Sequence, residues 1–107
     1  MTNLSFSKIW RVKEGKAEIF RAWMAEMDGS RRDEALATFD YENVTREVFA
    51  MFRGGDGNDY VVAFNESNGP VGPSDPSVSI NVEHKVIRNE CLETISDPGE
   101  VLLDLKK

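Results

Sequence analysis

The stretch VTREVFAMFR-GGDGN-DYVVAFN, residues 44–65, decides the fold that this chain is expected to adopt. Residues 44–53 have a strand pattern with apolar side chains on both faces: Val48, Ala50 and Phe52 on one, and Phe49 and Met51 on the other. Residues 54–58 favour a turn because Gly, Asp and Asn tolerate positive φ. Residues 59–65 repeat the two-faced pattern, with Tyr60, Val62 and Phe64 opposite Val61 and Ala63. The stretch therefore predicts a β-hairpin.

The segments before the hairpin predict a strand followed by an interrupted helix. In residues 4–12 the apolar side chains share one parity and would line one face of a strand: Leu4, Phe6, Trp10 and Val12. Residues 16–27 have helical spacing, with one apolar stripe of Ile19, Phe20, Trp23, Met24 and Met27. Gly29 and Ser30 break or kink this helix. Its second piece, residues 31–39, has Arg32, Ala35, Leu36 and Phe39 on one side.

The segments after the hairpin predict a loop, a helix and a last strand. Residues 67–76 are rich in Pro and Gly and predict the loop. Residues 79–95 predict a helix, with a stripe of Ile80, His84, Ile87, Cys91 and Ile95. Residues 100–105 predict the last strand. The resulting order, βαββαβ, is that of a single ferredoxin-like α+β domain over residues 1–107, with both helices on one face of an antiparallel sheet.

The two-faced strands predict a partner for the sheet. Two helices can cover only one face of a sheet, and a face open to water usually alternates apolar with polar residues. The second apolar face is therefore expected to pack against the same face of another copy, which predicts a homodimer. The alternative is a monomer whose C-terminal tail folds across the sheet.

Composition excludes several classes of function. The chain has 107 residues, a net charge of −6 and scattered basic residues, which argues against a nucleic-acid partner. No apolar run is long enough for a membrane span, and the first residues do not resemble a secretion signal, so a cytoplasmic protein is expected. With one Cys and one His, no disulfide and no metal-ligand spacing is available, and no cofactor is expected.

The single histidine, His84, is the first candidate for a functional residue. Its place on an apolar helical stripe means either a general acid or base facing a pocket, or a core histidine with a satisfied hydrogen bond. Cys91 lies on the same stripe, but two helical turns separate it from His84 by about 10 Å, too far for a nucleophile and its base.

Four further residues are candidates for substrate binding. Arg32, at the apolar edge of its helix, could bind a carboxylate or phosphate, or pair with Glu34, Glu47 or another acid. Arg46 and Glu47 lie on opposite faces of the same strand, so one should face the helices and the other the dimer interface. Glu47 could orient His84 or act as a base with a raised pKa, and the alternative is a structural ion pair. Trp10 could line the pocket or pack in the core.

Four short motifs carry a resemblance to a known family: RVKEGK (11–16), RDEAL (32–36), VTREVF (44–49) and Glu83-His84. They are similar to a small prokaryotic family known as domain of unknown function 6176 (DUF6176), over residues 8–92. The resemblance implies kinship with the dimeric α/β barrels, ferredoxin-like chains that pair through their sheets. That wider group includes cofactor-free oxygenases, sugar mutarotases and small isomerases.

Two kinds of function follow as expectations. The first is a small cofactor-free isomerase, mutarotase or oxygenase-like enzyme, with His84 as acid or base and Arg32 and Glu47 positioning the substrate. The alternative is a non-catalytic ligand-binding or stress-associated module, or a purely structural domain in which His84 belongs to the core.

Overall fold

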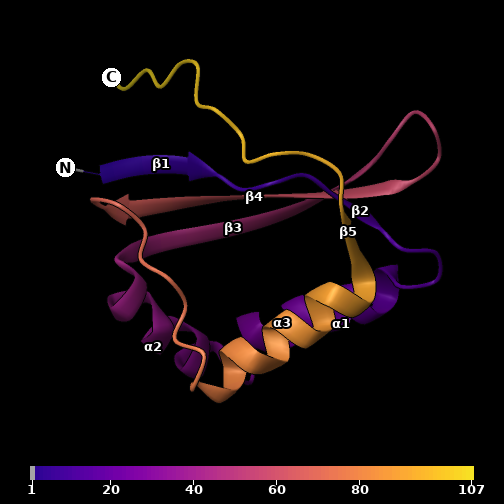
Figure 1. Cartoon of the computed structure of the whole chain (residues 1–107), viewed down its shortest axis with the longest axis horizontal. Helices are drawn as coiled ribbons and strands as arrows, with labels where there is room; N and C mark the ends of the chain where they lie inside the picture. The colour runs from indigo at the N-terminus through magenta and orange to yellow at the C-terminus, as the bar shows by residue number, and fades with distance from the viewer. Residues whose placement is uncertain (1) are drawn as a thin grey trace.

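Strand β4 (Asp59–Asn68) is the centre of the sheet in the computed structural model, which describes residues 2–107 (Figure 1). One edge of β4 pairs along its length with β3 (Val44–Arg53). Its other edge pairs with β1 (Thr2–Phe6) and then with β2 (Trp10–Val12). All of these pairings are antiparallel, and the hairpin predicted from residues 44–65 is confirmed.

A short strand directly after the last helix completes the five-stranded open sheet. This strand, β5 (Leu92–Thr94), pairs with β2 through the register Val12↔Leu92. The prediction of a strand over residues 100–105 is wrong, because residues 95–107 contain no strand. β2 is only three residues long, and the segment that pairs with it begins at Leu92, whose backbone is already extended where the helix ends.

The first strand is interrupted, which changes the faces of its side chains. Phe6 pairs with Phe64 and Trp10 pairs with Val61, so four steps along this edge oppose three steps along β4. An extra residue in one strand of a pair turns the following side chains to the other face. The prediction that Leu4 and Phe6 share a face with Trp10 is therefore wrong: Trp10 faces the core, whereas Leu4 and Phe6 face away from it.

All three helices lie on one side of the sheet: α1 (Ala17–Asp28), α2 (Arg32–Glu42) and α3 (Ser79–Cys91) (Figure 1). The predicted helices over residues 16–27 and 31–39 are confirmed, as separate elements that are joined at residues 29–31. The prediction that α3 extends to Ile95 is wrong, since the chain leaves the helix at Cys91 to form β5.

The core lies between the helices and the inner face of the sheet. Its buried residues come from β2, α1, β4, α3 and β5: Trp10, Val12, Phe20, Val61, Ala63, Cys91 and Leu92. Phe20 is only 2% exposed and contacts Phe49 of β3 edge-on, with ring centroids 6.3 Å apart. Alternation along β3 places Glu47 on this same inner face, two residues before Phe49.

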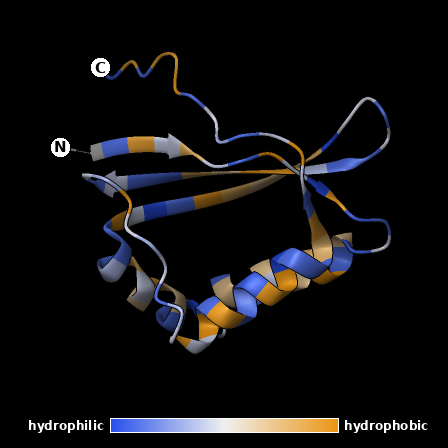
Figure 2. Ribbon diagram, viewed as in Figure 1, coloured by the Kyte–Doolittle hydropathy of each residue, from blue (hydrophilic) through white to orange (hydrophobic). Residues whose placement is uncertain are grey.

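No helix of the described chain covers the outer face of the sheet (Figures 1 and 2). Phe6 and Phe52 are 40% and 57% exposed there. The C-terminal tail does not bury its leucines on this face: Leu102 and Leu105 are 86% and 83% exposed. Instead, residues 95–99 follow the junction between β1 and β2, where the backbone N–H of Ile95 donates to the carbonyl of Ile9 at 3.0 Å.

Candidate functional site

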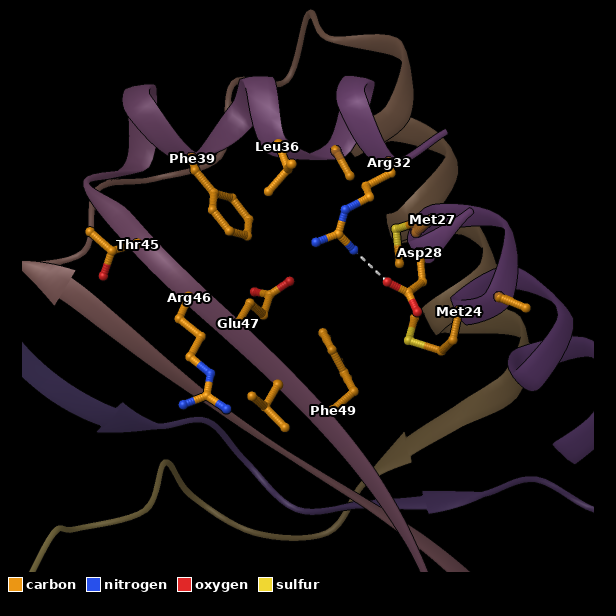
Figure 3. Close-up of a pocket in the computed structure, with 13 residues that line it drawn as sticks. Met24, Met27, Asp28, Arg32, Leu36, Phe39, Thr45, Arg46, Glu47 and Phe49 are labelled. Carbon is orange, nitrogen blue, oxygen red and sulfur yellow. Dashed lines mark hydrogen bonds and ion pairs between the residues drawn. The ribbon is translucent and has the colours of Figure 1, made fainter. Parts of the chain in front are cut away.

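A two-part cleft lies between the helices and the inner face of β3 and β4. The inner cleft has a volume of about 280 Å³ and includes Trp10, Glu47, His84 and Arg88 in its lining. The outer cleft has a volume of about 600 Å³ and is lined by the end of α1, one side of α2 and the start of β3 (Figure 3). Five residues line both parts and form the boundary between them: Met27, Ala35, Phe39, Glu47 and Phe49.

Glu47 is the carboxyl group at this boundary. It points from β3 into the cleft (Figure 3), and its partner across the strand pair is Asn65. The Asn65 amide, with its nitrogen directed at the carboxylate, donates a hydrogen bond to Oε2 of Glu47 at 3.0 Å. Although the side chain stays open to solvent through the cleft, desolvation by the surrounding protein and, less, the charge of Glu42 raise the pKa of Glu47 to about 7. Glu47 can therefore hold or release a proton near neutrality.

His84 lies on the opposite wall of the inner cleft and is held in one tautomer. The indole Nε1–H of Trp23 donates to Nδ1 of His84 at 2.9 Å, so the imidazole proton is on Nε2. The ring also meets Phe49 edge-on, at 5.9 Å between centroids. Burial and, less, the positive charge of Arg88 lower the pKa of His84 to about 4. His84 is therefore a neutral hydrogen-bond donor at pH 7.

Trp23 is itself fixed by a cation that joins the helices. The guanidinium of Arg31, just before α2, lies 5.5 Å from the centre of the Trp23 ring. Arg31 also pairs with Glu34 at 2.6 Å and with Glu83 of α3 at 2.5 Å. Arg31 and Trp23 thus hold α1, α2 and α3 together at the point where His84 is oriented.

The other predicted site residues are distributed over three places. Trp10 forms part of the buried floor of the inner cleft and stacks on Phe49 at 6.4 Å. Arg32 lies in the outer cleft and pairs with Asp28 at 2.6 Å (Figure 3). Arg46 turns away from Glu47 and lies 3.8 Å from Glu66 on the outer face, and it also contributes to the lining of the outer cleft (Figure 3). The structure therefore brings together Trp10, Glu47 and His84, and it separates Arg46 from them.

Two polar residues of the inner cleft were missed from the sequence. Arg88 follows His84 by one helical turn, so the spacing that singled out His84 places Arg88 on a neighbouring part of the same face. Asn65 is opposite Glu47 because the turn at residues 54–58 sets the hairpin register. Both could have been found by extending the helical and hairpin patterns to their polar positions.

The comparison with known families now adds a classification. The sequence model of the "Family of unknown function (DUF6176)" matches residues 3–107. The chain belongs to this family. No curated protein and no solved structure matches it. Within residues 2–107 of this DUF6176 chain, no three or more His, Cys, Asp or Glu side chains are grouped to hold a metal ion, and no helix has the length and hydropathy to cross a membrane.

The state of His84 can be measured directly because it is the only histidine. We expect its imidazole C–H signals, followed by NMR against pH, to titrate near pH 4. Arg88→Gln should raise this pKa, since it removes a positive charge that disfavours the imidazolium. Lys85→Gln, the same charge change on the exposed side of α3, should leave it unchanged. A midpoint near 6.5 in the wild-type protein would contradict the buried, neutral assignment.

The raised pKa of Glu47 predicts a stability that falls as pH rises. The folded protein binds the Glu47 proton more tightly than the unfolded chain does. This tighter binding therefore contributes its full stabilisation below the unfolded-state pKa of 4.5, and the contribution is lost as pH rises through about 7. Glu47→Gln should therefore stabilise the protein at pH 8 relative to wild type by about 1 kcal/mol, a value reduced for the solvent access of this side chain. Urea unfolding at pH 5 and pH 8 tests this. The matched variant Glu26→Gln, at an exposed residue of α1, is the control for the loss of a carboxylate outside the cleft.

Proposed function

We propose that this DUF6176 protein is a small cofactor-free enzyme of the isomerase or mutarotase type, whose substrate binds in the inner cleft. The observation that carries the proposal is a carboxyl group with a pKa of about 7, Glu47, in the same small cleft as a neutral imidazole with a fixed tautomer, His84. A volume of about 280 Å³ lies just below the range of about 300–1,000 Å³ for drug-sized ligands, so the cleft suits a small substrate.

Glu47 suits the acid–base role better than His84 does. A catalytic acid or base works best when its pKa is near the working pH, which holds for Glu47. His84 would be a weak base at neutral pH, and its Nδ1 lone pair is already occupied by Trp23. The sequence predicts His84 as the acid or base and Glu47 as a positioning residue, with Glu47 as a base of raised pKa as the alternative, and the proposed site uses that alternative.

His84 supplies the complementary part of a proton transfer. When Glu47 removes a proton from a carbon next to a carbonyl, or from a hydroxyl group, negative charge develops on a substrate oxygen. The Nε2–H of His84 has no hydrogen-bond partner among residues 2–107, and it belongs to a side chain that lines the cleft. A neutral imidazole in this position stabilises the oxyanion by donating a hydrogen bond. Glu47 then returns its proton to a different atom, which completes an isomerisation.

The arrangement of strands supports a homodimer of ferredoxin-like chains as the form that carries this site. If β1 and β2 are counted as one interrupted strand, the order across the sheet is β5, β1–β2, β4, β3, as in a ferredoxin-like sheet. The occupant we propose for the outer face is the same face of a second copy. Its central residues are apolar, Val48, Ala50, Val62 and Phe64, and its margin carries both charges of the pair Arg46–Glu66, so two copies related by a twofold axis would be complementary.

The function is tested with three probes of known proton-transfer chemistry. These are hydrogen–deuterium exchange of the α-protons of phenylacetone, keto–enol interconversion of phenylpyruvate, and mutarotation of glucose. We expect acceleration of at least one of them, reduced roughly 100-fold or more in Glu47→Gln. The rate should rise with pH through a midpoint near 7, the pKa of Glu47. Glu26→Gln, at an exposed residue of α1 outside the cleft, serves as the control and should retain the wild-type rate.

Two results would refute the proposal that this protein is an enzyme. One is equal rates for wild type and Glu47→Gln, and the other is no acceleration of any probe. The second result, combined with a shift of the His84 NMR signals by one of the probes, would favour the non-catalytic binding module.

The homodimer is tested by light scattering after size exclusion. We expect a mass of twice the 12.0 kDa of one chain. Phe52→Glu places a charge on the outer face, where Phe52 is 57% exposed, and should give monomers. Ile19→Glu, at a residue of α1 that is 41% exposed, is the control and should remain dimeric. A wild-type mass of one chain at all concentrations would contradict the proposed interface.

A further inference from the structure

Arg88 is the one arginine in residues 2–107 without an ion pair. Every other arginine has a carboxylate oxygen within 4.0 Å: Arg11, Arg21, Arg31, Arg32, Arg46 and Arg53. In a chain with 19 acidic residues against 13 basic ones, an unpaired arginine is unexpected on the basis of composition alone. Arg88 is also half-buried and lines the inner cleft.

No carboxylate of residues 2–107 forms an ion pair with Arg88, although its charge acts on Glu47 across the same cleft. Glu42 also lines the inner cleft, but its Oε1 accepts a hydrogen bond from Ser74 at 3.0 Å. Glu47 is opposite Asn65, which donates to its Oε2. Both carboxylates therefore have polar partners on other elements. The guanidinium keeps its planar set of N–H donors, a geometry that matches the two oxygens of a carboxylate.

His84 adds a second donor on the same helix. It precedes Arg88 by one turn of α3, and its Nε2–H is directed by the hydrogen bond that Trp23 makes to Nδ1. A negatively charged group in the inner cleft would meet the charged fork of Arg88 and the neutral donor of His84. Because both residues belong to α3, their backbone positions one turn apart are set before any ligand binds.

The rest of the cleft is apolar enough for a hydrophobic body. The boundary residues Met27, Ala35, Phe39 and Phe49 are nonpolar, and the outer cleft adds Met24 and Leu36 (Figure 3). Methionines adapt to irregular ligand shapes because their side chains are flexible and polarizable. In the outer cleft, the cation of Arg32 is neutralised by Asp28. The charged end of a ligand is therefore favoured at Arg88, and its apolar end near Met27 and Phe39.

We infer that the cleft binds a small amphipathic carboxylic acid, with its carboxylate on Arg88 and its apolar body against Met27, Phe39 and Phe49. This deepens the proposed function, since it names the class of substrate that Glu47 would act on. The carboxylate on Arg88 places the neighbouring carbon atoms of the ligand between α3 and Glu47 of β3. Arg88 is thus a specificity residue, and its role in binding does not depend on turnover.

The experiment compares an acid with its neutral analogue. The probes are 3-phenylpropionate and 3-phenylpropan-1-ol, which share the apolar body and differ in the carboxylate. Binding is measured by calorimetry and by the shift of the His84 NMR signals. We expect the acid to bind more tightly than the alcohol, and Arg88→Met to weaken the acid about 10- to 100-fold while leaving the alcohol unchanged. Arg88→Lys, which keeps the charge without the planar fork, should recover part of the affinity.

Arg53→Met is the matched control, because it removes an arginine that lies outside the cleft and is already paired with Asp59. This variant should bind 3-phenylpropionate as the wild type does, and thermal unfolding of each variant verifies that it is folded. Equal affinity of wild type and folded Arg88→Met for the acid would overturn the inference and leave Arg88 a partner of the α3 helix dipole only. No binding of the acid by wild type would overturn it as well.

The outcomes separate this inference from the proposed function. Arg88-dependent binding of 3-phenylpropionate without acceleration of any proton-transfer probe would retain the ligand class and reject the enzyme. Glu47-dependent turnover of phenylacetone with no role for Arg88 would retain the enzyme and reject the ligand class.

Discussion

The structure depends on the pairing of β4 with both of its neighbours. β3 occupies one edge of β4, and β1 and β2 share the other, so three of the remaining strands take their position directly from it. The register of β3 on β4 sets Glu47 opposite Asn65 and Phe49 opposite Ala63. A shift of one residue would turn Glu47 to the outer face and remove it from the cleft. The position of Glu47 in the cleft therefore depends on the register of β3 on β4.

The cleft contains two titratable groups whose pKa values are displaced in opposite directions. Desolvation disfavours the charged form of each, which raises the pKa of Glu47 and lowers that of His84. Arg88 adds to the shift of His84 and opposes that of Glu47, because its positive charge disfavours an imidazolium and favours a carboxylate. The charge of Arg88 thus adds to the burial that keeps His84 neutral, and it limits the rise in the pKa of Glu47. For this reason Glu47 can exchange a proton near neutral pH, whereas His84 remains a neutral hydrogen-bond donor.

Local patterns predicted the parts of the fold that depend on contacts near in sequence. The hairpin and the stripes of α1 and α2 follow from side-chain periodicity, and the bounds of β3 match the predicted strand. The same patterns placed Glu47 and Trp10 among the candidate site residues. They failed where pairing with a distant strand decides the outcome. The extra residue between Phe6 and Trp10 is defined only by its register on β4, and β5 forms only because β2 offers a free edge there.

The sequence by itself determined that His84 lies on the inner side of its helix and that the central strands are apolar on both faces. It could not determine the state of His84, because that depends on Trp23, 61 residues away along the chain, and on the charge of Arg88. Nor could it show that Arg88 lacks a carboxylate partner within residues 2–107, since ion pairs depend on distances between separate elements. Tertiary structure decided both, because desolvation and charge pairing arise only when α1, α3 and the sheet pack around one cleft.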